Sequence, residues 1–463
     1  MTTTEPVLTR SRELAAFGAS ITADALPEPV VHNARRAFVD WTAAALAGSG
    51  EPAAAKLRGV VAAVGGDGPC TVVGTTLRTS PPFAALANAY TSHLLDYDDV
   101  YNPSATTIHL GSCVWPAVLA IGQARGLAGP ALVAAYVAGF EVGARVACAA
   151  GPQHYESGWH VTGTAGHLAA AAAAANALGL SAEATTHALG CAATQAAGVR
   201  EVYGSDTKAI HPGKAAMDGV LAALLAENGF TSTDTALEGE RGLLRAITPR
   251  PYPELLTEGL GTDGSGTHWH VLDNGHKLYP SASLTHPAID AVLALEPVDP
   301  AEVAAIEVRM AGFAAAVTAL AQPETGAAAK FSTAHCVAAA LTRRHAGPAE
   351  FTDIVVADPV VAALRDKVTV LADEAVTKRG CLLRITLHDG TELRSTVEQN
   401  KGTPAAPLTD ADLEDKLVTA GDATLGHQTT DLLVKSCWAL DRLAGLDELM
   451  AYVTPVSPVS HAG

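Results

Sequence analysis

The hydrophobic pattern of the chain changes in character near residue 260. Before that point, long runs rich in Ala and Leu that end at or near Gly predict one helix after another. Because Ala side chains are thin, we expect these helices to pack closely against one another. The clearest predicted helices cover 114–126, 131–151, 167–180 and 215–230.

Beyond the Gly-rich connection LGTDGSGTHWH (260–270), shorter runs rich in β-branched residues predict strands with helices between them. The last strand-like run contains Asp389 and Gly390 between alternating apolar residues, which predicts a β-hairpin. This texture is typical of a small α+β domain. The predicted strands cover 306–310, 367–376 and 381–397, and the predicted helices among them cover 285–295 and 332–344.

After residues 400–417 the pattern becomes helical again, and we expect this C-terminal part to pack on the first domain. The fold class is therefore predicted as mainly α. A large helical domain over 1–262 would be completed by 403–463, and a smaller α+β domain would occupy 263–402. A chain of 463 residues is long enough for two such cores.

Charge and cysteine content narrow the class of protein. The net charge of −18 argues against nucleic acid or an anionic membrane as partner, although a local basic pocket for a small anion is compatible with it. The seven cysteines form no close pairs, which favours buried free thiols in a reducing compartment. The N-terminus lacks the apolar core of a signal peptide, and the apolar runs are interrupted before they reach the length of a membrane span. We expect a soluble cytoplasmic protein.

Histidine and lysine residues gather just ahead of predicted helix starts. A helix N-terminus presents unpaired N–H groups and the positive end of the helix dipole, so it already favours anions. Added cations strengthen that preference, and we predict that the four segments converge on a carboxylate-rich ligand. These segments carry His109, His160, Lys208 with His211, and Lys277 with His286.

Helix capping is the simpler interpretation for some of these positions. His211 and His286 are as well explained by a role in capping their helices. For the helix that follows His160 we expect Thr162 or Thr164 as the N-cap. An isolated histidine such as His154 is expected at the surface.

The acidic stretch LLDYDDVYNPSATTIH (94–109) raises the possibility of a metal site, because Asp96, Asp98 and Asp99 lie within four residues. It lacks the Gly and terminal Glu of an EF-hand loop, and the chain has no HExxH motif or Cys ligand set. A Mg²⁺ site on Asp96 and Asp99 stays open, but it requires remote partners. No GxGxxG motif precedes a predicted helix and no GxxxxGK[ST] motif occurs, so nucleotide cofactors are unsupported, and no GxSxG motif of α/β-hydrolases occurs.

Several segments in chain order resemble the MmgE/PrpD family. This family includes 2-methylcitrate dehydratases, cis-aconitate decarboxylases and iminodisuccinate epimerases. Such a series of segments is specific for the family but not for one reaction. The segments are ARRAFVDWTAAALAGS (34–49), LANAYTSHLLDYDD (86–99), GWHVTGTAGHLAAAAAAANALGL (158–180), SDTKAIHPGKAAMDGVLAALLAENGFT (205–231), KLYPSASLTHPAIDA (277–291) and AKFSTAHCVAAAL (329–341).

The resemblance implies a large all-helical domain made from both chain ends, a smaller α+β lid domain, an active site between them and a homodimer. It also implies catalysis without a metal or an organic cofactor. Carried over by motif, the expected catalytic residues are Asp96, His109, His160, Lys208 and Lys277.

The same resemblance suggests a role for each of these residues. Lys208 and Lys277 would hold substrate carboxylates, with Lys277 as a candidate proton donor as well, and His109 and His160 would act as acid/base groups. Asp96 would act as a base or orient a histidine. Asp98 and Asp99 would instead hold the loop or a neighbouring helix start.

The chain departs from the family pattern where we expect substrate contacts. Val100 stands where a hydroxyl residue is usual, Ala282 and Ser283 stand where many relatives carry Cys-Arg, and His335 stands where an aromatic residue is common. These departures make it unsafe to transfer one relative's substrate. The expected substrate-binding residues are Val100, Thr162, Thr164, His211, Ser281, Ser283 and His335.

Three functions remain compatible with the sequence. The first is a lyase, either a dehydratase or a decarboxylase, that acts next to a carboxylate of a small di- or tricarboxylic acid. The second is an isomerase or epimerase of an amino- or imino-dicarboxylate that removes a proton and returns it to the opposite face. The third is a non-catalytic carboxylate binder, against which the joint presence of the five candidate catalytic residues argues.

Overall fold

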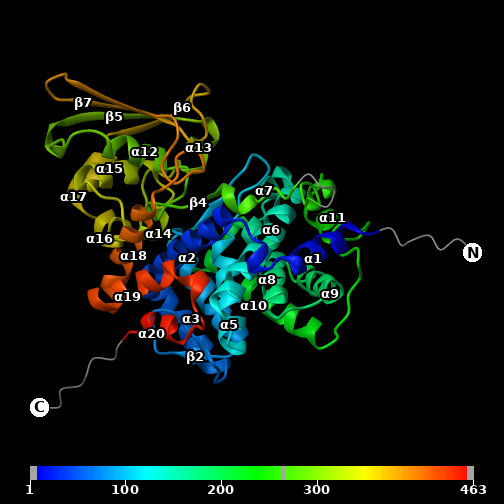
Figure 1. The fold of residues 1–463 in the computed structure, drawn as a ribbon. Helices are drawn as coiled ribbons and strands as arrows, with labels where there is room; N and C mark the ends of the chain where they lie inside the picture. Colours follow the sequence, from blue (N-terminus) through cyan, green and yellow to red (C-terminus); the bar gives the residue numbers. More distant parts are fainter. Residues whose placement is uncertain (1–7, 262–265, 456–463) are drawn as a thin grey trace, which may run out of the picture. The chain divides into compact units, whose positions relative to one another are not determined.

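The structure, a computed structural model, describes residues 8–261 and 266–455. Two compact units emerge from its contacts, and Figure 1 shows the helices and strands of each. Among the described residues, the helical unit comprises 8–94, 98–261, 266–274 and 413–455, and the sheet unit comprises Leu95–Tyr97 and Gly275–Asp412. The predicted domain boundary at 262 and 263 lies outside the described residues, and the boundary at 402 and 403 stays a prediction.

The helical unit is built almost entirely from α-helices, and the predicted mainly α class is confirmed. Its few strands are two residues long, and β1 and β2 pair antiparallel. The helices are α1 (Arg10–Ser20), α2 (Glu28–Ser49), α3 (Pro52–Val64), α4 (Pro81–His93), α5 (Gly111–Arg125), α6 (Gly129–Ala150), α7 (Pro152–Glu156), α8 (Val161–Ala177), α9 (Ala182–Ala193), α10 (Ile210–Glu227), α11 (Leu243–Ile247), α18 (Asp410–Leu425), α19 (His427–Trp438) and α20 (Asp447–Tyr452). The strands are β1 (Cys70–Thr71), β2 (Arg78–Thr79) and β3 (Val100–Tyr101), and β4 (Asn274–Gly275) lies at the boundary with the sheet unit.

Thin side chains allow the central helices to approach closely, as their composition predicts. α8 packs against both α6 and α10. A Cβ atom placed on Gly139 of α6 would lie 2.6 Å from the Cβ of Ala173 on α8. One placed on Gly219 of α10 would lie 2.5 Å from the Cβ of Ala170. These contacts hold the N-terminal turns of α8 and α10, which carry the candidate residues, in a fixed relation.

Helix α6 is long and apolar enough to cross a membrane, contrary to the expectation from the sequence. Of its most apolar window, 94% is buried inside the protein. Burial by neighbouring helices accounts for this composition, because a helix that is apolar all round suits a protein core as well as a bilayer. Buried Glu141 and Arg145 lie on this helix and form an ion pair of 3.0 Å.

The sheet unit contains a four-stranded sheet in the order β6-β5-β7-β8. β5 pairs parallel with β6 and antiparallel with β7, and β7 pairs antiparallel with β8 through the predicted hairpin at Asp389 and Gly390. α12 packs on β7 and β8, and α15 packs on β6, so helices cover the sheet (Figure 1). The strands are β5 (Val303–Met310), β6 (Val368–Ala372), β7 (Cys381–Leu387) and β8 (Glu392–Val397), and the helices are α12 (His286–Leu293), α13 (Gly312–Val317), α14 (Gly326–Ala329), α15 (Thr333–Arg343), α16 (Asp353–Val356) and α17 (Pro359–Arg365).

All seven cysteines are free thiols. Six of them are buried and Cys191 is half-buried, so the prediction of buried free thiols is confirmed for six.

Candidate functional site

A cluster of histidines forms where the starts of α8 and α10 meet in the helical unit. His160 is the N-cap residue of α8, and His211 lies in the first turn of α10. Their Nδ1 atoms are 2.8 Å apart, so one ring donates a hydrogen bond to the other. The expected N-cap at Thr162 or Thr164 is wrong, because both threonines lie inside α8.

Burial and positive neighbours hold both of these histidines neutral. Burial lowers the pKa of His160 well below its ordinary value, and the charges of His93, Lys208, His109 and His211 lower it further. Burial also lowers the pKa of His211 to about 4, with His93 and Lys208 adding to the effect. A bound anion would relieve this repulsion, so the cluster favours a negatively charged ligand.

The two neutral histidines must be in different tautomers. A neutral imidazole carries one proton, on Nδ1 or on Nε2. The ring that donates from Nδ1 therefore has a bare Nε2, and the ring that accepts at Nδ1 carries its proton on Nε2. One histidine is thus a proton donor through Nε2 while the other is a proton acceptor, which is what general acid–base chemistry requires.

Lys208 is connected to this cluster through Tyr203. Its Nζ atom lies 5.3 Å from the centre of the Tyr203 ring, and that ring lies 5.2 Å from the ring of His160. Lys208 is half-buried on the short 3₁₀ segment Asp206–Ala209 that leads into α10. The structure thereby brings Lys208, His160 and His211 together in one unit.

A second group surrounds the buried carboxylate of Asp98. Its Oδ2 atom lies 2.8 Å from His93 Nδ1 and 2.6 Å from Ser112 Oγ, which donates to it. His109 Nδ1 lies 3.4 Å from the same oxygen and 2.7 Å from the carbonyl oxygen of Asp99. Because an imidazole with its Nδ1–H held by oxygen atoms presents a bare Nε2, this group fixes the orientation and tautomer of His109. The ring of His93 links it to the first group, since it lies 5.7 Å from the ring of His160.

Asp99 holds the start of α5, which agrees with the prediction that it holds a helix start. The backbone N–H of Gly111 donates to both of its carboxyl oxygens, at 3.0 and 3.1 Å, and Asn274 Nδ2 donates at 2.8 Å. Burial, with the charges of Asp98 and Asp40, nevertheless raises the pKa of Asp99 to about 8. The carboxyl of Asp99 therefore takes up a proton at a higher pH than an ordinary aspartate does.

His93, Asp98 and His109 also offer atoms that metals bind, because a nitrogen or oxygen of each lies within 4.8 Å of the others. The same atoms are hydrogen-bonded to one another, since Asp98 Oδ2 accepts from Ser112 Oγ at 2.6 Å and lies 2.8 Å from His93 Nδ1.

In the sheet unit, Asp96 and Lys277 form a buried ion pair. Lys277 Nζ donates to the Oδ1 of Asp96 at 2.9 Å and to its carbonyl oxygen at 3.0 Å. Asp96 has a φ of 53°, in the left-handed region that non-glycine residues seldom adopt. This conformation aims two oxygens of one residue at the same ammonium. Strain of this kind is common at functional sites.

The expected substrate-binding residues of the helical unit have well-defined partners. The hydroxyl of Thr162 accepts the backbone N–H of His109 at 3.1 Å, so it positions that histidine. The hydroxyl of Thr164 lies 2.7 Å from Nε2 of His154. His154 is fully buried, so the expectation that it lies at the surface is wrong. Val100 is buried in β3.

The expected substrate-binding residues of the sheet unit lie around α12 and α15. Ser281 Oγ lies 2.9 Å from Thr285 Oγ1, and Thr285 is the N-cap residue of α12. Ser283 is half-buried. His335 is buried in the first turn of α15, with its Nε2 atom 3.0 Å from the carbonyl oxygen of Glu350.

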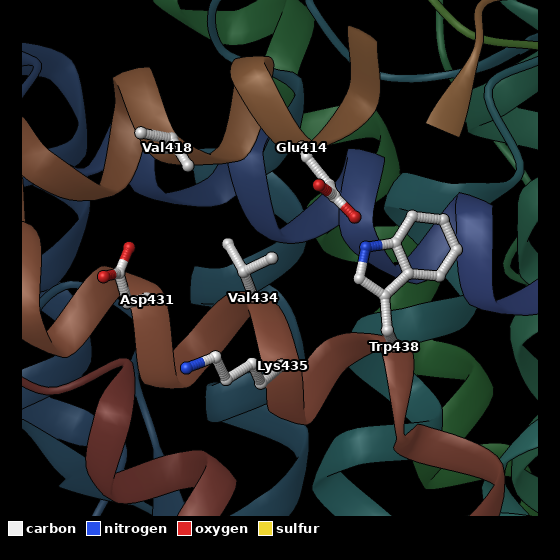
Figure 2. A pocket seen from close by; sticks show the side chains of 6 residues that line it. All are labelled: Glu414, Val418, Asp431, Val434, Lys435 and Trp438. Atoms are coloured by element: carbon white, nitrogen blue, oxygen red, sulfur yellow. The ribbon is translucent and has the colours of Figure 1, made fainter. Parts of the chain in front are cut away.

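A pocket on the helical unit lies apart from all of these residues. Figure 2 shows Glu414 and Val418 of α18 facing Asp431, Val434 and Trp438 of α19 across it, with Lys435 alongside. A second pocket is lined by α1 and the segment around Trp269. Neither pocket contains a predicted site residue.

Reasoning from the sequence missed His93, Ser112 and Tyr203 and underestimated Asp98. His93 is the last residue of α4, five positions before Asp98, a spacing without a recognised motif. Ser112 is separated from Asp98 by the irregular loop that ends at His109. A polar Ser beside Gly at a helix start was the available signal, and it is too common to single out a site.

The protein is mainly α, and its cluster of neutral histidines beside Lys208 favours an anionic ligand. Comparison with known proteins identifies its family. Residues 12–256 match the MmgE/PrpD N-terminal domain and residues 279–440 match the MmgE/PrpD C-terminal domain, so the chain belongs to the MmgE/PrpD family. The resemblance seen in the sequence is confirmed.

Among its relatives are proteins named for one reaction. The chain is similar to the cis-aconitate decarboxylase of Aspergillus terreus (strain NIH 2624 / FGSC A1156), with 27% identity that covers 95% of this chain and 94% of the relative. It is 27% identical to the cis-aconitate decarboxylase-like protein oryM of Aspergillus oryzae, and the alignment covers 93% of this chain and 94% of that relative. It is 24% identical to the cis-aconitate decarboxylase of Homo sapiens, and the alignment covers 82% of this chain and 81% of that relative.

Proposed function

We propose that this protein is a cofactor-independent decarboxylase that acts on a small tricarboxylic acid of the cis-aconitate type. The observation that carries the proposal is the His160–His211 pair, held neutral by burial and by nearby cations at the starts of two helices. The names of the relatives along nearly the whole chain support the same reaction.

The proposed decarboxylation uses only side chains that this chain supplies. The bond between the leaving carboxylate carbon and its neighbour breaks, and its electron pair moves into the adjacent conjugated system. A proton then forms a new C–H bond, and cis-aconitate would give CO₂ and an unsaturated C5 dicarboxylic acid. Lys208 would stabilise the negative charge that develops, and the histidine that carries its proton on Nε2 would supply the proton.

The other residues would assist in defined ways. Asp98 and the Asp99 carbonyl would keep His109 oriented. In the sheet unit, Lys277 would hold a carboxylate while Asp96 fixes its position. We include a homodimeric assembly and a cytoplasmic location in the proposal, on the strength of the resemblance and the composition.

A substitution experiment tests the proposal. Lys208→Ala and His160→Ala should each lower kcat/KM for cis-aconitate by about 100-fold or more, because each removes charge stabilisation or proton transfer. Lys435→Ala, in the pocket of Figure 2, should behave like wild type and serves as the matched control. Wild-type turnover in both active-site variants would contradict the assignment.

The second candidate is an epimerase of an imino- or amino-dicarboxylate, which the same donor and acceptor pair would serve. Assays on a panel of citrates, aconitates and iminodisuccinate separate the reactions. CO₂ release identifies a decarboxylase, water loss a dehydratase, and deuterium wash-in from D₂O without either identifies an epimerase. Binding without any turnover would identify a carboxylate binder.

A further inference from the structure

We propose that Arg379 is a further substrate-binding residue, which binds one carboxylate of the substrate beside Lys277 in the sheet unit. The inference rests on the proposed function, because it names the group that recognises an additional carboxylate of the polycarboxylic acid. Four observations within the sheet unit support it.

The first observation is the position of Arg379 at the tip of a tight turn between β6 and β7. The N–H of Gly380 donates to the carbonyl oxygen of Thr377 at 3.0 Å, which places Lys378 and Arg379 at the two central positions of the turn. Thr377 Oγ1 also donates to the carbonyl oxygen of Glu398 at 3.1 Å. The turn is therefore fixed to the end of β8.

The second observation ties this turn to α12, whose first residue is His286. The N–H of Asn400 donates to the carbonyl oxygen of Arg379 at 3.1 Å, and the next N–H, of Lys401, donates to Asp290 Oδ2 at 2.8 Å. Asp290 lies one turn after His286 on the same face of α12.

The third observation extends the connection to the segment that carries Lys277. The N–H of His276 donates to the carbonyl oxygen of Gly402 at 2.9 Å, and Tyr279 Oη donates to Asp290 Oδ1 at 2.6 Å. The rings of Tyr279 and His286 are 5.1 Å apart. Successive hydrogen bonds thus place the turn, α12 and Lys277 in one network, and the charges of Lys277 and Arg379 both act on His286.

The fourth observation is the uncompensated charge of Arg379. Lys277 is paired with Asp96, and the exposed Arg394 of β8 is paired with Glu392. For the half-buried Arg379 guanidinium, the described residues provide no carboxylate within 4.0 Å. Burial lowers its pKa with no acidic group to offset the effect. A half-buried cation is stabilised when an anion pairs with it, and a guanidinium matches a carboxylate in a two-pronged hydrogen bond. The substrate supplies the missing anion.

Arg379→Gln tests this, with Arg379→Lys as the conservative variant and Arg394→Gln as the matched control. Binding is measured by calorimetry with propane-1,2,3-tricarboxylate, a saturated tricarboxylate that has no double bond to accept the electron pair, and with glutarate, which lacks the third carboxylate. KM and kcat are measured with cis-aconitate. Thermal unfolding of each variant shows whether it is folded.

Arg379→Gln should raise the Kd for propane-1,2,3-tricarboxylate by roughly 10- to 150-fold, the range for a lost charged hydrogen bond. KM should rise more than kcat falls, the Kd for glutarate should change less, Arg379→Lys should recover part of the loss, and Arg394→Gln should bind like wild type. Equal tricarboxylate binding by wild type and Arg379→Gln, or none by wild type, would overturn the assignment. Loss of binding in Arg379→Gln, together with no CO₂ release by wild type, would support Arg379 and overturn only the proposed reaction.

Discussion

At the scale of single residues, the candidate site is governed by the protonation states of buried groups. Burial lowers the pKa values of His160 and His211, which favours their neutral form, and it raises the pKa of Asp99. Such opposed shifts arise from burial, which disfavours whichever form carries a charge. The sequence could predict that His160 and Lys208 matter, because they lie in motifs. It could not predict the His160–His211 contact, because these residues are 51 positions apart.

The lowered pKa of His211 predicts a loss of stability in acid. The unfolded chain takes up the proton near pH 6.5, whereas the folded protein resists it until about pH 4. The stabilisation is therefore complete above pH 6.5 and is lost as the pH falls toward 4, by about 3 kcal/mol. His211→Asn, which keeps a polar atom near Nδ1, should flatten the fall of the thermal midpoint between pH 6.5 and 4. An unchanged pH profile in this variant would show that His211 is not held neutral.

Asp98→Asn should lower kcat by about 100-fold with a small change in KM, because the neutral amide no longer holds the hydrogen bonds of His93 and His109 in place. Asp99→Asn is its control. It should keep most of the activity, since the side chain of Asn retains an oxygen that can accept the N–H of Gly111 at the start of α5. Steady-state kinetics on both variants checks this, and an equal loss of kcat in the two would refute the distinction between their roles.

At the scale of elements, local patterns predicted what local interactions determine. The hairpin of β7 and β8 follows from Asp389 and Gly390, and Gly390 has the positive φ of 87° that such turns require. The Ala-rich helices follow from propensity. The start of α8 was predicted incorrectly because its N-cap, His160, is stabilised by a distant partner, the carbonyl oxygen of Gly198.

Close helix packing gives a prediction with an internal control. Gly219→Ala should destabilise the protein by about 1–3 kcal/mol, because the new methyl group would meet Ala170 and Ala171 of α8. Gly59→Ala, in the open on α3, should instead stabilise it by about 0.5–1 kcal/mol through helix propensity. Denaturant unfolding measures the change in the free energy of unfolding for both variants. Equal changes would mean that α8 and α10 are not in close contact.

At the scale of the whole molecule, the C-terminal segment packs in the same unit as the N-terminal segment. α18 returns to the helical unit, where Lys416 forms a fully buried ion pair of 2.6 Å with Asp40 of α2. The sequence predicted that the C-terminal part packs on the first domain, but a single buried contact across 376 positions has no local signal.

This ion pair predicts a strong effect on stability. Lys416→Met should lower the free energy of unfolding by about 3–5 kcal/mol, because it removes the ammonium group that pairs with the buried carboxylate of Asp40. The double variant Asp40→Asn/Lys416→Met should recover part of that loss, as measured by thermal unfolding. If the double variant is no more stable than Lys416→Met, the loss of the charge pair with Asp40 is not the cause.

The central claim is that this chain decarboxylates a small tricarboxylic acid with its own side chains. The most direct measurement is an NMR time course of cis-aconitate with the purified, chelator-treated protein in D₂O. We predict equal amounts of CO₂ and a C5 unsaturated dicarboxylic acid, with formation of both slowed by about 100-fold or more in His160→Ala. Unchanged cis-aconitate, hydration of its double bond, or deuterium exchange without release of CO₂ would contradict the account.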